Sequence, residues 1–376
     1  MKQSRNRLSS PTVWPTLTAA GLGLFLLWRW QRRQRQPTEL AGQVVLITGA
    51  SRGLGLLLAH EFAHAHCRLI ICARDEQELA WAQRELEQAG AEVFALPCNV
   101  ADEVQVNHLV TQAIGHYGRI DILVNNAGII DVGPLQSTQL ADFEQALDVM
   151  YWGMLYTIWA VLPQMRARGD GRIVNITSIG GKVSIPHLLP YSSAKFAAVG
   201  LSEGLRAELT REGIAVTTIV PGLMRTGSHL NASFKGDLAG EFTWFSLGAS
   251  LPLISMDAQR AAEQIVMATC RREAVRILSL PALVLAYIHD LFPGFTNDTL
   301  GLINRLLPDG KGDLSQRRRG LEVQAALPPT HQRLQKLLTT WGRQAAERLH
   351  QYPLADDTTA TLEWRATGNR QNVGSD

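Results

Sequence analysis

The stretch QVVLITGASRGLG, residues 43–55, joins a short run of apolar residues to a turn that contains three glycines. A near-continuous run of valine, leucine and isoleucine is typical of a strand that is buried on both faces, as in a parallel sheet. Glycines let the backbone turn sharply, and the residues that follow have the length and composition of a helix. The stretch therefore predicts a strand, a tight turn and a helix in succession.

The same alternation of apolar runs and helix-length segments continues along the chain. Such alternation predicts repeated βαβ units. We therefore expect an α/β fold, a Rossmann-type doubly wound parallel sheet of about seven strands. The expected strands are Gln43–Thr48, Arg68–Ala73, Glu92–Pro97, Ile120–Asn125, Arg172–Thr177, Ala215–Val220 and Ala274–Leu280, the last stopped by Pro281.

Composition excludes several classes of protein. The chain has 376 residues, of which 46% are hydrophobic and 19% charged, so it is neither a disordered chain nor a disulfide-stapled miniprotein. A net charge of +2 argues against nucleic acid as the main partner, because phosphate binding needs a clustered excess of Lys and Arg. The four cysteines show no C-x-x-C spacing, and we interpret them as reduced core residues.

Residues 1–40 differ in composition from the rest of the chain. They hold seven basic residues and one acidic residue, and the 21 residues from Leu8 to Trp28 carry no charge. About 20 apolar residues span a bilayer, so we predict an N-terminal membrane anchor, with a shallow interfacial helix as the alternative. The arginines between Arg29 and Arg35 outweigh the basic residues before the span, which favours a cytoplasmic catalytic domain.

The other two parts are an α/β domain at residues 41–310 and a C-terminal extension at 311–376. Residues 282–292 are apolar but too short to span a bilayer, and could lie on a membrane, close over a pocket or pack as an ordinary helix. Residues 331–350 carry apolar side chains at helical spacing, which predicts a helix that docks on its own domain. The last twenty or so residues have the composition of an unstructured tail.

The glycine-rich turn also has a chemical interpretation. Exposed N–H groups at the start of a helix bind anions, and glycines allow a pyrophosphate to approach the backbone closely. Because the turn directly follows the first buried strand, we interpret Gly49–Gly55 as a dinucleotide-binding loop rather than a purely structural turn.

From this loop onward the chain resembles the classical short-chain dehydrogenase/reductases, over roughly residues 42–230. The matching motifs are T-G-x-x-x-G-x-G at Thr48–Gly55, N-N-A-G at Asn125–Gly128, a serine at Ser178, Y-x-x-x-K at Tyr191–Lys195 and P-G-x-x-x-T at Pro221–Thr226. The resemblance implies cofactor contacts for Gly49, Ser51, Arg52, Gly53, Leu54, Gly55, Arg74, Asn99, Val100, Asn126, Ala127, Gly128, Tyr191, Lys195, Pro221, Gly222 and Thr226.

Three residues are expected to carry the chemistry. Tyr191 and Lys195 are i, i+4 neighbours on a helix, so the ammonium is expected to favour the phenolate and lower the pKa of the tyrosine. Tyr191 can then exchange a proton with a carbonyl or alcohol oxygen, while Ser178 hydrogen-bonds the same oxygen. The resemblance further implies that Lys195 holds the nicotinamide ribose and relays the proton.

One position departs from the family pattern. The family usually has an asparagine in the helix after the N-N-A-G strand, and Met150 stands there. A thioether cannot replace an amide, so the water-linked proton relay is in doubt unless the Met150 backbone carbonyl supports it.

The charge at the end of the second strand indicates which cofactor is used. A carboxylate there binds the ribose 2'-hydroxyl of NAD and repels a 2'-phosphate. Ala73 stands at that position, followed by Arg74, and Arg52 lies in the glycine loop. Two guanidiniums can bind a phosphate, so NADP(H) is favoured over NAD(H), although Asp75 is close by. Asn99 would receive the adenine amino group.

A competing motif is His60-Glu61-Phe62-Ala63-His64, a formal H-E-x-x-H. Two histidines at i, i+4 can bind zinc with the glutamate as base, which would make the protein a zinc hydrolase. Because the motif falls on the helix after the glycine loop, we interpret these as solvated helix residues, and we expect no metal site.

The sequence thus predicts a membrane-anchored NADP(H)-dependent oxidoreductase that interconverts a carbonyl and an alcohol. An apolar, aromatic segment from Leu230 to Leu253 holds the position of the family's substrate loop and suggests a lipophilic substrate: a steroid, retinoid, fatty aldehyde or ketoacyl lipid. A non-catalytic NADP(H)-binding scaffold is the alternative, made conceivable by Met150. The resemblance also makes a homodimer an expectation.

Overall fold

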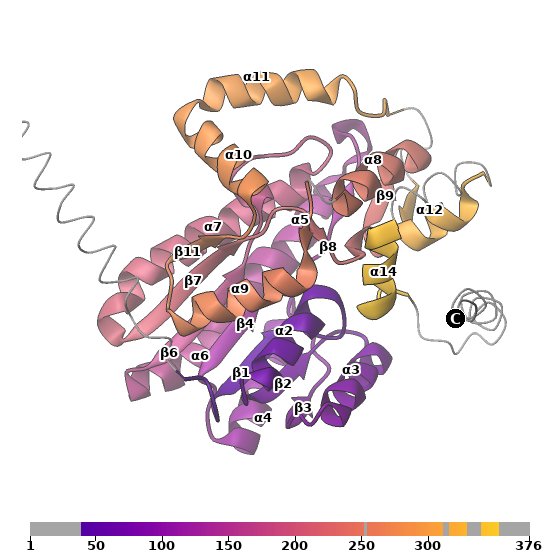
Figure 1. The fold of residues 1–376 in the computed structure, drawn as a ribbon. Helices are drawn as coiled ribbons and strands as arrows, with labels where there is room; N and C mark the ends of the chain where they lie inside the picture. The colour runs from indigo at the N-terminus through magenta and orange to yellow at the C-terminus, as the bar shows by residue number, and fades with distance from the viewer. Residues whose placement is uncertain (1–38, 252–253, 311–315, 329–339, 353–376) are drawn as a thin grey trace, which may run out of the picture. The chain divides into compact units, whose positions relative to one another are not determined.

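Seven strands form one sheet in the order β11-β7-β6-β4-β1-β2-β3, and all neighbouring strands are parallel (Figure 1). The computed structural model describes residues 39–251, 254–310, 316–328 and 340–352. The strands of the sheet are β1 Val44–Thr48, β2 Arg68–Cys72, β3 Val93–Ala95, β4 Ile122–Asn125, β6 Gly171–Ile176, β7 Ile214–Val220 and β11 Val275–Ile277. The expected Rossmann-type sheet of seven parallel strands is confirmed.

The central strands are buried along their whole length because helices cover both faces of the sheet. Every residue of β1, β4 and β6 is buried, which explains why these strands are mostly apolar. The buried polar side chains Asn125 and Asn175 hydrogen-bond each other at 3.0 Å. The edge strands β3 and β11 have three residues each, shorter than the sequence predicts. The prediction that Pro281 stops the last strand is wrong: β11 ends at Ile277, and Pro281 lies in the first turn of a helix, where its missing N–H has no cost.

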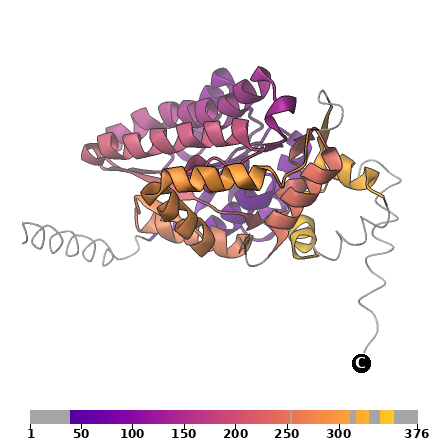
Figure 2. The ribbon, with the colours of Figure 1, turned by 90° about the horizontal axis from the view of Figure 1, so that it is seen from above.

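Helices lie on both faces of the sheet (Figure 2), and an apolar core is buried beneath each layer of helices. The first is closed by α2 Gly53–His64, α3 Glu76–Gln88 and α9 Ala258–Cys270. The second is closed by α4 Glu103–Tyr117, α6 Gly153–Arg168 and α7 Leu189–Leu209. Of the cysteines, all of which are free, Cys67, Cys72 and Cys98 are buried, as expected of core residues, and Cys270 is half-buried.

Smaller elements connect the sheet to the C-terminal part of the chain. The short strands are β5 Asp131–Val132, β8 Met224–Arg225, β9 Ser233–Lys235, β10 Met256–Asp257 and β12 Arg317–Arg319. The remaining helices are α5 Leu140–Leu147, α8 Leu238–Ser250, α10 Leu280–Leu291, α11 Pro293–Asn304, α12 Gly320–Ala326 and α14 Thr340–Arg348. One-turn 3₁₀ helices lie at Leu135–Ser137, Ile179–Gly181, Thr210–Glu212 and Ser228–Leu230, and a π-helical turn lies at Asp148–Trp152.

A third core joins the segment after β7 to the C-terminal extension. Phe234 and Phe242 are fully buried there, together with Val323 of α12 and Ala346 of α14. The predicted docking of the amphipathic C-terminal helix on its own domain is therefore confirmed for Thr340–Arg348. The residues from 329 to 339, the N-terminal segment 1–38 and the tail from 353 lie outside the described residues, so the predicted anchor and tail stay predictions.

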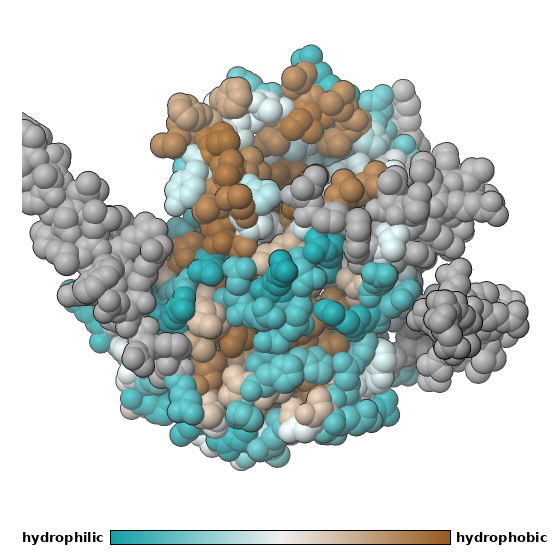
Figure 3. All heavy atoms as spheres, viewed as in Figure 1, coloured by the Kyte–Doolittle hydropathy of each residue, from teal (hydrophilic) through white to brown (hydrophobic). Residues whose placement is uncertain are grey.

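The helices α10 and α11 expose an unusual amount of apolar surface (Figure 3). Their exposed apolar side chains include Leu280, Val284, Tyr287, Ile288, Leu291, Phe292, Phe295, Leu302 and Ile303. Within the described part of the chain, however, none of the helices combines the length and the apolar character that a membrane crossing requires.

Candidate functional site

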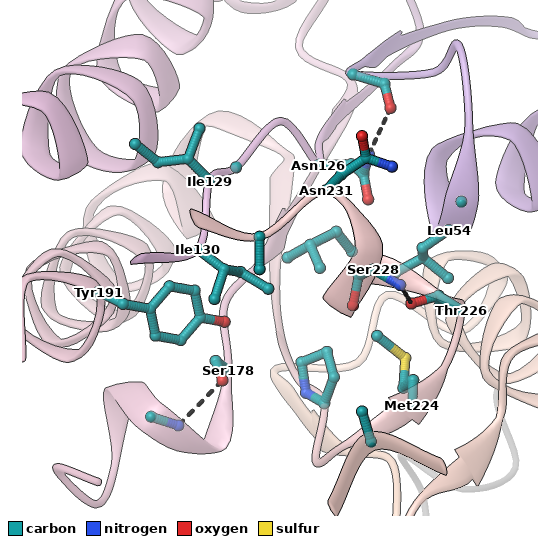
Figure 4. A pocket seen from close by; sticks show the side chains of 18 of the residues that line it. Leu54, Asn126, Ile129, Ile130, Ser178, Tyr191, Met224, Thr226, Ser228 and Asn231 are labelled. Carbon is teal, nitrogen blue, oxygen red and sulfur yellow. Dashed lines mark hydrogen bonds between the residues drawn. The ribbon is translucent and has the colours of Figure 1, made fainter. Parts of the chain in front are cut away.

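A pocket of about 1120 Å³ is lined by the loops that follow the carboxyl ends of the parallel strands. This edge is where open α/β sheets bind ligands. All the residues predicted to contact the cofactor or carry the chemistry lie on the wall of this one pocket, from Gly49 of the glycine loop to Thr226 after β7. Residues more than a hundred positions apart in sequence therefore face one space (Figure 4).

The glycine loop is shaped so that side chains would not fit. Gly49 has a φ of +64°, and a Cβ on it would lie 2.9 Å from the Ala127 Cα. A Cβ on Gly55 would lie 2.1 Å from the Gly49 carbonyl oxygen. The atoms that an added Cβ would meet belong to the backbone, so they cannot move aside as the end of a flexible side chain could. The loop leads into the start of α2, and this cradle fits the diphosphate of a dinucleotide.

Thr48, which sequence reasoning did not assign, ties the two cofactor loops together. Its hydroxyl accepts hydrogen bonds from the backbone N–H of Asn126 at 3.0 Å and of Ala127 at 3.1 Å. The Asn126 side chain donates in return to the carbonyls of Thr48 and Gly49, both at 3.0 Å. The only sequence signal for this role was the threonine that opens T-G-x-x-x-G-x-G.

Ser178 and Tyr191 meet across Gly180. Ser178 follows β6 and caps a 3₁₀ turn, its Oγ accepting a hydrogen bond from the Gly180 N–H at 3.0 Å. A Cβ on Gly180 would lie 3.1 Å from Cε1 of Tyr191 and 3.4 Å from the Ser178 Oγ. Glycine therefore lets the serine and the phenol approach each other, and Figure 4 shows them side by side, with Ile130 beside the ring.

The electrostatics of Tyr191 differ from the prediction. Burial raises the pKa of Tyr191 above its usual value of 10, and a hydrogen bond with Ser178 opposes that rise. The Lys195 ammonium donates to the Ile176 carbonyl at 2.8 Å and lies 5.9 Å from the centre of the tyrosine ring. The expectation that the pKa of Tyr191 is lowered is therefore wrong for this structure, because the largest effect is the burial of the phenol, which raises it.

The same burial acts on the lysine. Lys195 is 5% exposed, and its burial lowers the pKa of the ammonium from 10.5 to about 8. A buried amine with a pKa near neutrality can both hold a proton and release it, which suits a relay position.

Met150 lies in the π-helical turn Asp148–Trp152 and is buried. Its sulfur would be 3.7 Å from a Cβ placed on Gly128, so the thioether packs under the N-N-A-G loop. The methionine fills space against the cofactor loop and supplies no amide there.

An acidic residue that the sequence did not reveal lies where the cofactor's 2' position is expected. Glu78, from the first turn of α3, binds Arg52 at 2.5 Å and accepts a hydrogen bond from the Ser51 hydroxyl at 3.2 Å. Arg74 lines the same end of the pocket and is exposed. Asp75 instead caps α3 by accepting from the Glu78 N–H at 2.9 Å. The sequence could have indicated this contact only through the position of Glu78, four residues after Arg74.

A set of apolar side chains also lines the pocket: Ile130, Ile185, Leu188, Trp244, Phe245 and Leu285. The charged residues Arg317, Arg318, Arg319 and Glu322 of the C-terminal extension line it as well. Of the aromatic residues in the predicted substrate loop, Trp244 and Phe245 therefore line the pocket, whereas Phe234 and Phe242 belong to the third core. Residues Pro281 and Ala282 of α10 also line the pocket, which favours the pocket-closing interpretation of this apolar stretch.

The H-E-x-x-H residues do not converge on a shared point. His60 Nε2 hydrogen-bonds Glu85 at 2.8 Å, and Glu61 accepts from the Gln259 side chain at 2.6 Å. Among the residues that the structure describes, no group of three or more His, Cys, Asp or Glu side chains is arranged to hold a metal ion.

Comparisons with known proteins agree with this geometry. The family model described as short chain dehydrogenase matches residues 43–234. The chain is 37% identical over 268 residues to a "Dehydrogenase/reductase SDR family protein 7-like" of Anopheles gambiae, covering 70% of this chain and 82% of that protein. It is 40% identical over 195 residues to the Streptomyces violaceoruber protein with the description "Granaticin polyketide synthase putative ketoacyl reductase 1", covering 50% of this chain and 71% of that one.

A solved structure shows the same fold with a cofactor in place. The gluconate 5-dehydrogenase of Burkholderia cenocepacia, in complex with NADP and tartrate, matches with a TM-score of 0.57 and 27% identity, covering 65% of this chain and 96% of that one. Together with the glycine cradle, this similarity supports a nicotinamide dinucleotide as the cofactor. The chain belongs to the short-chain dehydrogenase/reductase family and is an oxidoreductase of that family.

Proposed function

We propose that this protein is an NADP(H)-dependent oxidoreductase that interconverts a carbonyl and an alcohol on a lipophilic substrate. The observation that carries the proposal is the convergence of Ser178, Tyr191 and Lys195 in the same pocket as the glycine loop. A proton donor, a hydrogen-bond partner for the substrate oxygen and a relay amine are what carbonyl reduction requires of the protein.

The residues have separate tasks in carbonyl reduction. A nicotinamide dinucleotide held by the glycine loop would supply the hydride for the carbonyl carbon. Tyr191, which burial keeps protonated, donates its hydroxyl proton to the carbonyl oxygen. Ser178 hydrogen-bonds the same oxygen while negative charge develops on it. Lys195 then returns a proton toward the phenolate, and the reverse sequence oxidises an alcohol.

The preference for NADP(H) rests on Arg74 and on the absence of a carboxylate at Ala73, both at the pocket wall. Arg52 can bind the 2'-phosphate once it turns from Glu78, because a doubly charged phosphate attracts a guanidinium more strongly than a carboxylate does. Glu78 opposes this preference, and its contribution can be measured by substitution.

The apolar side chains that line the pocket, and the position of α10 beside them, support a lipophilic substrate of the steroid, retinoid, fatty aldehyde or ketoacyl type. One face of α10 lines the pocket while the other exposes Leu291 and its neighbours. We infer that this face and the N-terminal segment contact a membrane, from which an apolar substrate enters. Leu291 ends α10, Leu306 follows α11, and both side chains are exposed. Replacing the two by serine is expected to reduce sedimentation with phospholipid vesicles. The control is Leu135→Ser, an exposed leucine in another part of the fold; equal sedimentation of the control and the double variant would refute membrane contact by this surface.

The decisive experiment is a panel of carbonyls and alcohols graded by chain length and ring number, followed by NADPH absorbance. We expect turnover of apolar carbonyls and its loss, by about a thousandfold or more, in Tyr191→Phe with NADPH binding retained. Tyr156→Phe, outside the pocket, serves as the matched control. NADPH binding without turnover of any carbonyl, or undiminished turnover by Tyr191→Phe, would favour the non-catalytic scaffold or another mechanism. Homodimerisation stays a prediction.

A further inference from the structure

The segment Ala345–Tyr352, here called the C-terminal strap, lies on the glycine loop from the outside. The Gly53 N–H donates a hydrogen bond to the Leu349 carbonyl at 2.9 Å. Gly53 begins α2, and the first N–H groups of a helix have no partner within the helix. The strap therefore occupies one donor of the loop that receives the diphosphate.

Gln351 brings the strap into the pocket. It is 4% exposed and lines the pocket wall. Asn231 donates from its side chain to the Gln351 backbone carbonyl at 2.8 Å and to its side-chain oxygen at 2.9 Å. The amide nitrogen consequently turns toward the loop, 2.7 Å from where a Cβ on Gly53 would stand. A hydrogen-bond donor thus lies at the edge of the diphosphate cradle.

His350 fastens the strap away from the pocket. Its ring stacks on Trp81 with the ring planes 19° apart, and its Nε2 bonds a Glu85 carboxylate oxygen at 2.6 Å. Glu85 also binds His60, and these two hydrogen bonds lower the pKa of Glu85 to about 2. His350 itself has a φ of +56°, which costs free energy for a residue with a side chain. The strained backbone turns Leu349 inward to the loop and Gln351 to the pocket.

The rest of the strap is closely packed. Leu349 is 2% exposed in the first core. A Cβ on Gly227 would lie 2.4 Å from that of Ala346, so the backbone after β8 comes directly under the strap. These contacts connect the strap to both sides of the pocket, the glycine loop and the segment that carries Thr226.

We propose that the C-terminal strap is part of the cofactor site and retains the bound dinucleotide. Gln351 is a binding residue for the diphosphate side of the cofactor, and His350 is a positioning residue that holds the strap in place. The strap must leave Gly53 before the dinucleotide can exchange. The proposal rests on dinucleotide binding at the glycine loop and not on the identity of the substrate.

The test measures release of NADPH from the full-length protein by stopped-flow fluorescence, which needs no substrate. His350→Ala is expected to accelerate release about tenfold, because it removes a charge-assisted hydrogen bond and a stacked ring. Gln351→Ala is expected to raise the Kd for NADPH several-fold. The control is His64→Ala, which also removes a histidine ring. His64 ends α2, and its side chain is 70% exposed. A structural role alone would lower the thermal stability and leave the release rate unchanged, and that result would overturn the proposal.

A reversible tether gives a second, independent measurement. Gly342 lies in α14, just before the strap, and a Cβ on it would lie 3.2 Å from that of Ser250, so a small separation of the two backbones would reach the about 3.5–4.5 Å of a disulfide. In the Gly342→Cys, Ser250→Cys variant, oxidation should slow both entry and release of NADPH, and reduction should restore the rates. Equal exchange rates in the two states, or tighter NADPH binding by His350→Ala, would show that the strap does not retain the cofactor.

Discussion

Replacing Gly180 by alanine tests whether the Ser178–Tyr191 pair carries the chemistry. The new Cβ would stand 3.1 Å from Cε1 of Tyr191 and 3.4 Å from both Cδ1 and the Ser178 Oγ. Carbon atoms in contact prefer about 3.5–4.0 Å, so the phenol ring must recede by roughly half an ångström. A displacement of about 1 Å can cost about a hundredfold in rate, so half of it should cost about tenfold.

The assay separates positioning from binding and folding. The kcat for carbonyl reduction should fall about tenfold in Gly180→Ala, with the Kd for NADPH within about twofold of the unchanged protein. Gly200→Ala is the matched control on α7, because nothing lies within 4 Å of its added Cβ. That control should keep full activity and raise the free energy of unfolding by up to about 1 kcal/mol.

Two results would refute the reasoning. Full kcat in Gly180→Ala would mean that the serine and the phenol need not approach across this glycine. A loss of activity that follows the loss of NADPH binding or of folded protein would mean that Gly180 is required by the fold and not by the reaction.

Two further predictions concern charge. Burial lowers the pKa of Lys195 from 10.5 to about 8, so the ammonium loses its proton as the pH rises through that value. We therefore expect kcat/KM for reduction to fall above about pH 8, and the fall to move beyond pH 10 in Lys195→Arg. A kcat/KM of the unchanged protein that stays constant up to pH 10 would contradict this prediction. Glu78→Gln removes the carboxylate that binds Arg52 and leaves the guanidinium free for a 2'-phosphate. This variant should raise the ratio of kcat/KM for NADPH to kcat/KM for NADH about tenfold, whereas Arg74→Ala should lower that ratio. An unchanged ratio in both variants would show that these residues do not select the cofactor.

The sheet could be predicted almost completely, because a strand that is buried on both faces is mostly apolar. The edge strands were less predictable, since β3 and β11 have only half-buried or exposed residues and their ends depend on the neighbouring strand. Pro281 was misread for a related reason. Proline ends a strand and also suits the first turn of a helix, and only the packing of α10 on the pocket distinguishes the two.

The sequence by itself determined the order of the strands along the chain and the glycine loop, because hydrophobic period and turn chemistry are local. It also predicts Ser178, Tyr191 and Lys195 as the catalytic residues, because they are recognised by their spacing along the chain. The tertiary structure decided what surrounds them. Glu78 meets Arg52, Gly180 separates the serine from the phenol, and Gln351 reaches the glycine loop only after the chain has folded. The tertiary structure also decided the pKa of Tyr191, because the desolvation that raises it depends on all the groups around the ring. Those groups come from distant parts of the chain and cannot be predicted from the residues next to Tyr191.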